Sequence, residues 1–259
     1  MKNPSKRLVW KLVDEGGIWD ELGLEQDEKL NYNQGSIELN TCICDIEKKF
    51  EEIKGNKNYA KNDTDFKTIF PLNAKCEGGY AIIGKDTIYL SKNRKKGQGR
   101  SSKRRYGGGF DSGHILARQL VRNEENGQNK GRGIIINYNN FHNIYPQTPW
   151  SNKGSAPKKS ERGEKKENEE VRNQTYFENL LVNYIQDKSE ELFYRVKLVY
   201  GKDASELVPR GARIQAIKII QFNDKKVLGE NLFNVFIPNV TETCLIDYTN
   251  RDNLTEVSP

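Results

Sequence analysis

The apolar residues between positions 170 and 237 follow two different periods, and this pattern constrains the fold more than any other. Five apolar residues of the segment 170–188 recur at the spacing of an amphipathic helix: Phe177, Leu180, Leu181, Tyr184 and Ile185. The segments 192–200 and 212–220 alternate apolar with polar residues, as half-exposed antiparallel strands do, and 233–237 is a further strand. This combination predicts an α+β fold, in which helices pack on a central antiparallel sheet.

The first 65 residues predict a small helical attachment to the main domain. A short helix is expected from Lys6 to Val13, further turns from Ile18 to Leu24, and a clearer helix from about Asn40 to Lys54. We therefore divide the chain into an N-terminal helical attachment (1–65), a main domain (66–250) and a frayed tail (251–259).

The composition bounds the class of protein. With 259 residues, of which 35% are hydrophobic and 30% charged, the chain is long enough for one large domain and is not globally disordered. Its net charge of +6 mildly favours an anionic partner. No apolar window is long enough for a membrane span. The apolar run after the basic N-terminus is too short and broken for a signal peptide, so the protein is expected to be cytosolic, exported by another route, or separated from a leader.

The four cysteines do not form a metal-binding pattern. Only Cys42 and Cys44 are close in sequence, whereas Cys76 and Cys244 stand alone, and zinc needs a fuller set of ligands. Buried free thiols are therefore favoured over a metal or disulfide role.

The hairpin expected from 79–83 and 87–90 leads into a basic run. Eight of the fourteen residues from 92 to 105 are Lys or Arg, and none is acidic. Most such runs are solvated loops, but this one leads directly into a Gly-rich stretch that carries a histidine, which favours a track for phosphates. The candidate phosphate contacts are Arg100, Lys103, Arg104, Arg105 and, beyond the histidine, Arg118.

That stretch, 110–117, carries His114 directly after Gly113. An imidazole titrates near neutral pH and suits general-base catalysis, and a glycine lets the backbone approach a ligand closely. Asp111 is placed either to orient an imidazole or to cap a turn. By itself the pattern also fits an ordinary loop histidine.

A second stretch, 143–152, places Asn143 and Asn152 near Gln147 and Trp150. Mg²⁺ prefers oxygen ligands and keeps most of its waters, so one amide oxygen together with phosphate oxygens would make a site. An Asn pair by itself is more often part of turn chemistry.

Together the two stretches resemble the DNA/RNA non-specific endonuclease family, the ββα-metal or His–Me finger nucleases. The family signature is Asp-Arg-Gly-His, then Asn-x-x-x-Gln, then a metal-binding Asn. The similar residues here are 111–114, 143–147 and Asn152, and 176–179 resembles the Tyr-x-Glu-Asn helix of the family. Several linked motifs in the right order are a strong signal.

Further segments resemble the downstream strands of the competence DNA-entry nucleases, at 194–196, 207–211, Asn239 and 246–248. This similarity to bacterial secreted and toxin nucleases implies a secreted or exported protein.

The resemblance implies a Mg²⁺-dependent endonuclease of low sequence specificity, with Mn²⁺ as the alternative cofactor. His114 would be the general base, Asn152 the metal ligand, and Asn143 would support the site. Glu178 would hold metal-bound waters; it lies about 100° round the helix from Phe177, so it can flank the buried face. The substrate would be DNA, the preference between DNA and RNA stays open, and the products would carry 5′-phosphates.

One position departs from the family signature, because Ser112 stands where the family has Arg. The phosphate contact of that Arg would be vacant or supplied by Arg104, Arg105 or Arg118.

Two other interpretations of the function are open: a nucleic-acid-binding module that has lost catalysis, and a nuclease toxin domain held by a cognate inhibitor protein.

Overall fold

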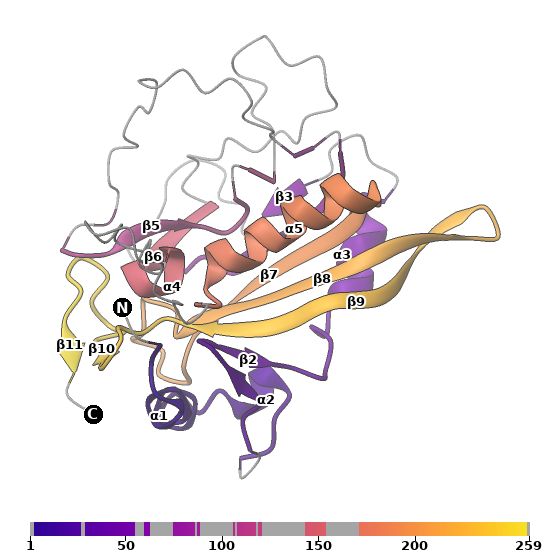
Figure 1. The fold of residues 1–259 in the computed structure, drawn as a ribbon. Helices are drawn as coiled ribbons and strands as arrows, with labels where there is room; N and C mark the ends of the chain where they lie inside the picture. Colours follow the sequence, from indigo (N-terminus) through magenta and orange to yellow (C-terminus); the bar gives the residue numbers. More distant parts are fainter. Residues whose placement is uncertain are drawn as a thin grey trace, which may run out of the picture.

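The computed structural model of the protein describes residues 3–26, 29–54, 60–62, 75–85, 87, 88, 106, 108–117, 119, 120, 143–153 and 171–257. The helices among them are α1 (Lys6–Gly16), α2 (Trp19–Leu22), α3 (Ile46–Ile53), α4 (Pro149–Lys153) and α5 (Gln174–Lys188). The strands are β1 (Tyr32–Asn33), β2 (Ser36–Glu38), β3 (Ala60–Asn62), β4 (Gly78–Ile83), β5 (Asp111–His114), β6 (Ile144–Gln147), β7 (Leu192–Val199), β8 (Gly211–Phe222), β9 (Lys225–Pro238), β10 (Leu245–Ile246) and β11 (Glu256–Val257). Figure 1 shows the α+β arrangement that the sequence predicts, with helices packed on a central antiparallel sheet. None of the described helices is long and apolar enough to cross a membrane.

The described residues place seven strands in the main sheet, in the order β1-β2-β9-β8-β7-β4-β3. The three longest strands follow one another in the chain and pair antiparallel, as predicted. The expected half-exposure is wrong for β7, which is buried on both faces because α5 packs on one and the N-terminal residues on the other. The expected strand 233–237 is part of the longer β9. Beyond the other strands, β8 and β9 continue as a two-stranded arm (Figure 1). Asn223 and Asp224 close the arm with φ angles of 48° and 60°, as a tight two-residue hairpin turn requires.

The helix α5 crosses one face of this sheet. Its buried residues Phe177, Leu181 and Ile185 pack in one cluster with inward side chains of β7 and β8. The helix begins after Asn173, whose side chain accepts a hydrogen bond of 2.9 Å from the backbone N–H of Tyr176. The amphipathic helix expected from the sequence is therefore present and starts at residue 174.

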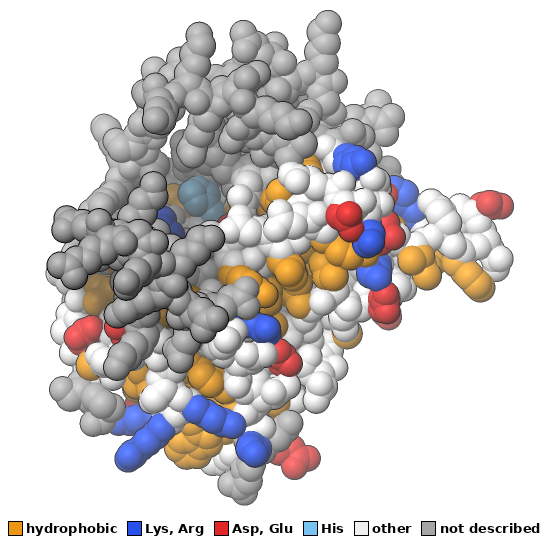
Figure 2. Space-filling view, in the orientation of Figure 1, with side chains coloured by type: hydrophobic (Ala, Val, Ile, Leu, Met, Phe, Trp, Pro, Cys, Tyr) orange, Lys and Arg blue, Asp and Glu red, His pale blue; other side chains and the backbone are white. Residues whose placement is uncertain are grey.

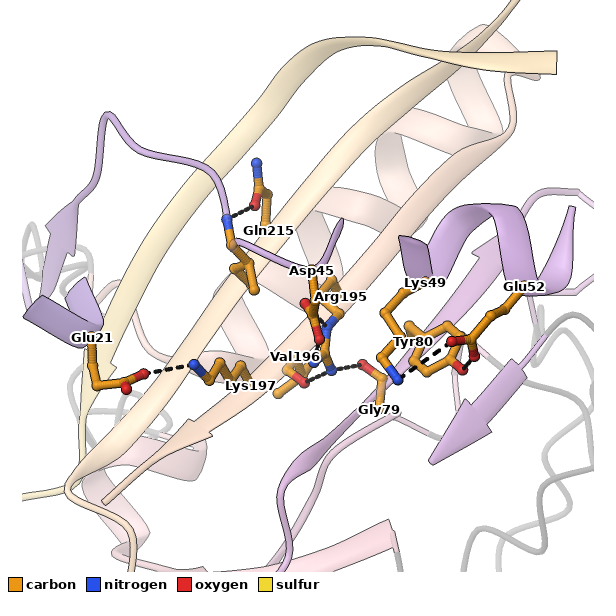
Figure 3. Close-up of polar contacts among 11 residues, drawn as sticks. Glu21, Asp45, Lys49, Glu52, Gly79, Tyr80, Arg195, Val196, Lys197 and Gln215 are labelled. Atoms are coloured by element: carbon orange, nitrogen blue, oxygen red, sulfur yellow. Dashed lines mark hydrogen bonds and ion pairs between the residues drawn. The ribbon is translucent and has the colours of Figure 1, made fainter. Parts of the chain in front are cut away.

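The N-terminal segment, meaning the described residues among 1–65, packs on the other face of the main sheet. On β7, Phe193 points to this face, because neighbouring residues of a strand point to opposite sides. Phe50 of α3 packs against it with ring centroids 5.5 Å apart. Figure 3 shows the polar contacts that accompany this packing, including the ion pair of Asp45 with Arg195 at 2.9 Å.

The N-terminal segment also contributes strands to the main sheet. The β1–β2 hairpin extends the sheet beyond β9, and β3 pairs with β4 at the opposite edge. The boundary expected at residue 65 falls between described residues, so the division into an attachment and a main domain stays a prediction.

The helix expected from Asn40 begins only at Ile46. The backbone N–H of Ile43 donates to Oε1 of Gln215 on β8, at 2.9 Å. Ile43 is therefore bonded to a side chain of the sheet and lies outside the helix. A contact with a residue so distant in the sequence overrides the local helical pattern.

The prediction of a hairpin from 79–83 and 87–90 is also wrong. Thr87 and Ile88 form a turn, in which both backbone N–H groups donate to the carbonyl of Gly84 at 2.9 and 3.1 Å. The first of the two expected strands is present as β4, which pairs with β3 and β7. Residues 89 and 90 lie outside the described residues.

The tail is not frayed, at least as far as residue 257. β11 pairs with β10, and the N–H of Leu254 donates to the carbonyl of Gly108 at 2.8 Å.

The cysteines are free thiols as expected, but only Cys76 is buried, whereas Cys42 and Cys44 are exposed.

Candidate active site

β5, β6 and α4 form a compact ββα unit, here called the finger (residues 111–114 and 144–153). The two strands pair antiparallel from Asp111 with Gln147 to His114 with Ile144, apart from the main sheet. Gly113 is required at its position, since a Cβ there would lie 2.1 Å from Oε1 of Gln147 and 2.9 Å from its Cδ. The glycine before the histidine therefore allows the side chain of Gln147 to cross the strand.

Asn143 closes the end of the finger at which His114 lies. Its side chain is fully buried and forms two hydrogen bonds with Leu116, from the Leu116 N–H to Oδ1 and from Nδ2 to the Leu116 carbonyl, both 2.9 Å long. Its own carbonyl accepts from the N–H of Ile115 at 2.9 Å. Asn143 thus fixes the backbone directly after His114, which is a supporting position.

Asn239 anchors the finger to the end of β9. Its Oδ1 accepts from the N–H of Thr148 at 2.8 Å, and its Nδ2 donates to the carbonyls of Pro146 and Pro209 at 3.1 and 3.0 Å. The finger therefore has a fixed position on the main sheet.

Asp111 contacts Asn152. Nδ2 of Asn152 donates to Oδ2 of Asp111 at 2.9 Å, and Nζ of Lys153 lies 3.1 Å from the same oxygen. An ionised carboxylate only accepts hydrogen bonds, so Asp111 selects the amide nitrogen of Asn152 and turns its Oδ1 the other way. No hydrogen bond to that Oδ1 forms within the described part of the chain.

Glu178 on α5 is buried, although a surface carboxylate would be the usual fate of a Glu on a helix. Burial raises the pKa of Glu178 to about 8, while the hydrogen bond from Gln174 lowers it. Tyr145 and Tyr194 lie nearby; burial, and then the charge of Glu178, raise the pKa of each phenol well above its usual range. Without a cation, the Glu178 carboxyl is therefore largely protonated at neutral pH.

Gln174 links these groups, although no sequence motif predicts a role for it. Its Nε2 donates to the carbonyl of His114 at 2.5 Å and to Oε1 of Glu178 at 2.9 Å. Its Oε1 accepts from the hydroxyl of Tyr145 at 2.8 Å and from Nε2 of Gln147 at 2.9 Å. The only sequence signal was its place one helical turn before Glu178.

The neighbouring residue, Thr175, holds the helix of the finger. Its hydroxyl donates to the carbonyl of Asn152 at 2.7 Å. Gln174 and Thr175 are consecutive, so the first turn of α5 contacts the strand of His114 and the helix of Asn152 together. The structure thereby places the backbone of His114, the backbone of Asn152 and the carboxyl of Glu178 around one turn of α5.

The predicted phosphate contacts Arg100, Lys103, Arg104, Arg105 and Arg118 lie outside the described residues. Acidic and basic side chains intermix over the described part of the surface that Figure 2 shows. Ser112 has a buried hydroxyl with no hydrogen-bond partner among the described residues. Trp150 is buried in the core and so does not present its ring to a ligand.

The donor groups of the finger suit a hard cation that keeps most of its waters. Within the described residues, no group of three or more His, Cys, Asp or Glu side chains could hold a metal ion. A cation would instead rely on one amide oxygen, with water and substrate oxygens as its other ligands, which Mg²⁺ accepts. Oδ1 of Asn152 fits this requirement because the contact with Asp111 orients it.

The arrangement is that of an α+β protein with a ββα finger mounted on an antiparallel sheet, and solved structures share it. The structure of NucA from Streptococcus agalactiae with a magnesium ion bound matches with a TM-score of 0.55 and 20% identity, covering 94% of this chain and 95% of that chain. The same protein with no metal bound matches with a TM-score of 0.53 and 22% identity, covering 88% and 90%. No family model matches the sequence. These similarities show that the chain has the fold of NucA.

Proposed function

We propose that the protein is a metal-dependent endonuclease of low sequence specificity, which hydrolyses phosphodiester bonds of DNA, with RNA as an alternative substrate left open, and leaves 5′-phosphates. One observation carries the proposal: the first turn of α5 joins the strand of His114, the helix of Asn152 and the buried Glu178. The fold that the chain shares with magnesium-bound NucA supports it.

In this proposal His114 takes the proton of the attacking water, and Asn152 supplies the protein ligand of Mg²⁺ or Mn²⁺ through Oδ1. Glu178 orients water beside the cation. The bound cation would stabilise charge on the scissile phosphate and on the leaving 3′-oxygen. A positive charge close to Glu178 lowers the pKa of its carboxyl, so the ionised form becomes available when the cation binds.

Asp111 and Asn143 act through other groups. Asp111 sets the orientation of the Asn152 amide, and Asn143 fixes the backbone next to His114. We therefore assign both to positioning rather than to direct contact with substrate.

Substrate binding is assigned to the basic run 92–105 and Arg118. Contacts to phosphates carry no sequence information, which agrees with low specificity. Export from the cell and inhibition by a cognate protein are further proposals that rest on the family resemblance alone.

Ser112 favours a second candidate, a nucleic-acid-binding module without catalysis. Its hydroxyl is buried where the family signature has a cationic side chain, so a phosphate contact made by that Arg would be missing from the strand itself. Metal-dependent cleavage distinguishes the two candidates.

The test is plasmid degradation by the wild type with Mg²⁺, the wild type with EDTA, and His114→Ala with Mg²⁺. Gln186→Ala, an exposed change on α5, is the matched control. We expect cleavage by the wild type and the control with Mg²⁺ only. Cleavage that survives His114→Ala would remove His114 from the proposal, and a plasmid that is shifted on a gel but never cut would favour the binding module.

A further inference from the structure

We infer that Gln174 is a positioning residue of the site, which holds the strand of His114 and the carboxyl of Glu178 in a fixed relation to each other. The inference rests on the proposed function. The side chain of Gln174 contacts both the strand of His114 and the carboxyl of Glu178, and no sequence motif marked it.

The hydrogen-bonding capacity of the Gln174 amide is fully used. A glutamine amide offers two N–H donors and one oxygen with two lone pairs. The two donations, to His114 and Glu178, measure 2.5 and 2.9 Å, and the two bonds accepted, from Tyr145 and Gln147, measure 2.8 and 2.9 Å. The side chain is 1% exposed, so water cannot replace a lost partner easily.

The partners fix which way the amide faces. The hydroxyl of Tyr145 can donate, and its partner atom on Gln174 is the oxygen, which also accepts from Nε2 of Gln147. The nitrogen of Gln174 must then face the carbonyl of His114 and the carboxyl of Glu178, both of which accept. The orientation therefore follows from the chemistry of the four partners.

This arrangement couples the two halves of the site. The same NH₂ group bonds to His114 on β5 of the finger and to Glu178 on α5, which packs on the main sheet, so a shift of His114 relative to Glu178 would stretch one of its two bonds. Donation from Gln174 also favours the ionised form of Glu178. Two effects are therefore expected from Gln174: a fixed spacing of the two groups, and a Glu178 that ionises more readily.

The main test variant is Gln174→Met, which has similar volume and cannot form these four bonds. The control is Gln186→Met, at an exposed position of the same helix. The assays give kcat and KM on a defined duplex across pH at saturating Mg²⁺, Tm without metal, and the rise of Tm that Mg²⁺ alone produces.

We expect kcat of Gln174→Met to fall by about tenfold to a hundredfold, as for groups that orient metal-site residues. KM should stay close to that of the wild type, and the acid limb of the pH profile should move to higher pH, because Glu178 loses its donor. The Mg²⁺-induced rise of Tm should shrink, while Gln186→Met behaves as the wild type does.

Gln174→Glu is a second variant for the case in which the Met variant does not fold. Its carboxyl can still accept from Tyr145 and Gln147, but it can donate to His114 or Glu178 only when protonated. Activity of Gln174→Glu should therefore decline as pH rises through the range in which the wild type gains activity.

The outcomes separate this inference from the proposed function. A wild type that cleaves no nucleic acid with Mg²⁺ or Mn²⁺ overturns the proposed function and this inference with it. An active wild type overturns the inference alone if Gln174→Met keeps the kcat and pH profile of the control. It is likewise overturned if activity falls equally at every pH with an unchanged response of Tm to Mg²⁺, since that result describes a merely structural role.

Discussion

The carboxylate of Asp111 accepts a hydrogen bond of 2.9 Å from the side-chain nitrogen of Asn152, across the junction of β5 and α4. This contact decides which atom of the Asn152 amide is presented to a ligand. Without it, the amide could present its NH₂ group, which repels a cation. In the proposed site, the acidic residue of the Asp-Ser-Gly-His stretch would therefore affect metal binding through its neighbour Asn152.

Asp111→Asn should weaken the apparent affinity for Mg²⁺ by about tenfold or more, because the new amide no longer selects the orientation of Asn152. The measurement is the Mg²⁺ dependence of plasmid cleavage together with the Mg²⁺-induced change of Tm. Asp187→Asn, an exposed change at the end of α5, is the control. An unchanged Mg²⁺ response in Asp111→Asn would show that the contact does not set the ligand.

Salt dependence tests the role of the basic run. The test variant changes four residues to Ser: Arg100, Lys103, Arg104 and Arg105. If each side chain binds a phosphate, the slope of log affinity against log salt for a random duplex in EDTA should become shallower by about 0.9 for each of them that is replaced. The control variant removes the same charge at four exposed lysines elsewhere: Lys48, Lys188, Lys202 and Lys225. Equal slopes in the two variants would assign the effect to net charge and not to a track.

The sequence predicts α5 and the long strands because their patterns are local. Five apolar residues at helical spacing predict α5, and three of them, Phe177, Leu181 and Ile185, form its buried face. The helical geometry places Glu178 beside that face. Three of the four bonds of Gln174 were not predictable, since their partners lie 27, 29 and 60 residues away in the chain. Only the spacing of four residues to Glu178 is local. The contact of Asp111 with Asn152 spans 41 residues in the same way.

The N-terminal segment illustrates the limit of local patterns. Ile43 lies within an apolar period that favours a helix, but its N–H bonds to Gln215, 172 residues away. The apolar period that begins near Asn40 corresponds to a helix only from Ile46 onward. Tertiary contacts of this kind decide boundaries that propensity alone cannot place.

Gly113→Ala should destabilise the finger. The added Cβ would lie 2.1 Å from Oε1 and 2.8 Å from Cβ of Gln147, so that buried side chain must move and lose its bonds to Gln174 and Ser151. We expect a loss of about 1–3 kcal/mol in the free energy of unfolding, measured by urea denaturation. Gly229→Ala on the exposed arm is the control, because its Cβ would lie 3.1 Å from the nearest atom, on Ile220. Equal stability of the two variants would contradict the close approach at Gly113.

Glu178 should make the stability of the metal-free protein depend on pH. Burial raises its pKa to about 8 from an ordinary value of 4.5, so the folded state binds a proton between these values that the unfolded state releases. The contribution of Glu178 to stability is therefore fully present below about pH 4.5 and is lost as pH rises through about 8.

The test compares the free energies of unfolding of the wild type and Glu178→Gln in EDTA from about pH 5 to about pH 8.5. The amide of the variant stays neutral throughout this range. The difference removes the titration of all other groups, and the wild type should lose on the order of a few kcal/mol relative to the variant as pH rises. Glu47→Gln, at an exposed position of α3, should track the wild type at every pH. Mg²⁺ should flatten the decline in the wild type, because a cation beside Glu178 favours its ionised form. A constant difference between wild type and Glu178→Gln would mean that the carboxyl is solvated, whereas a decline that Mg²⁺ does not alter would separate Glu178 from the metal site.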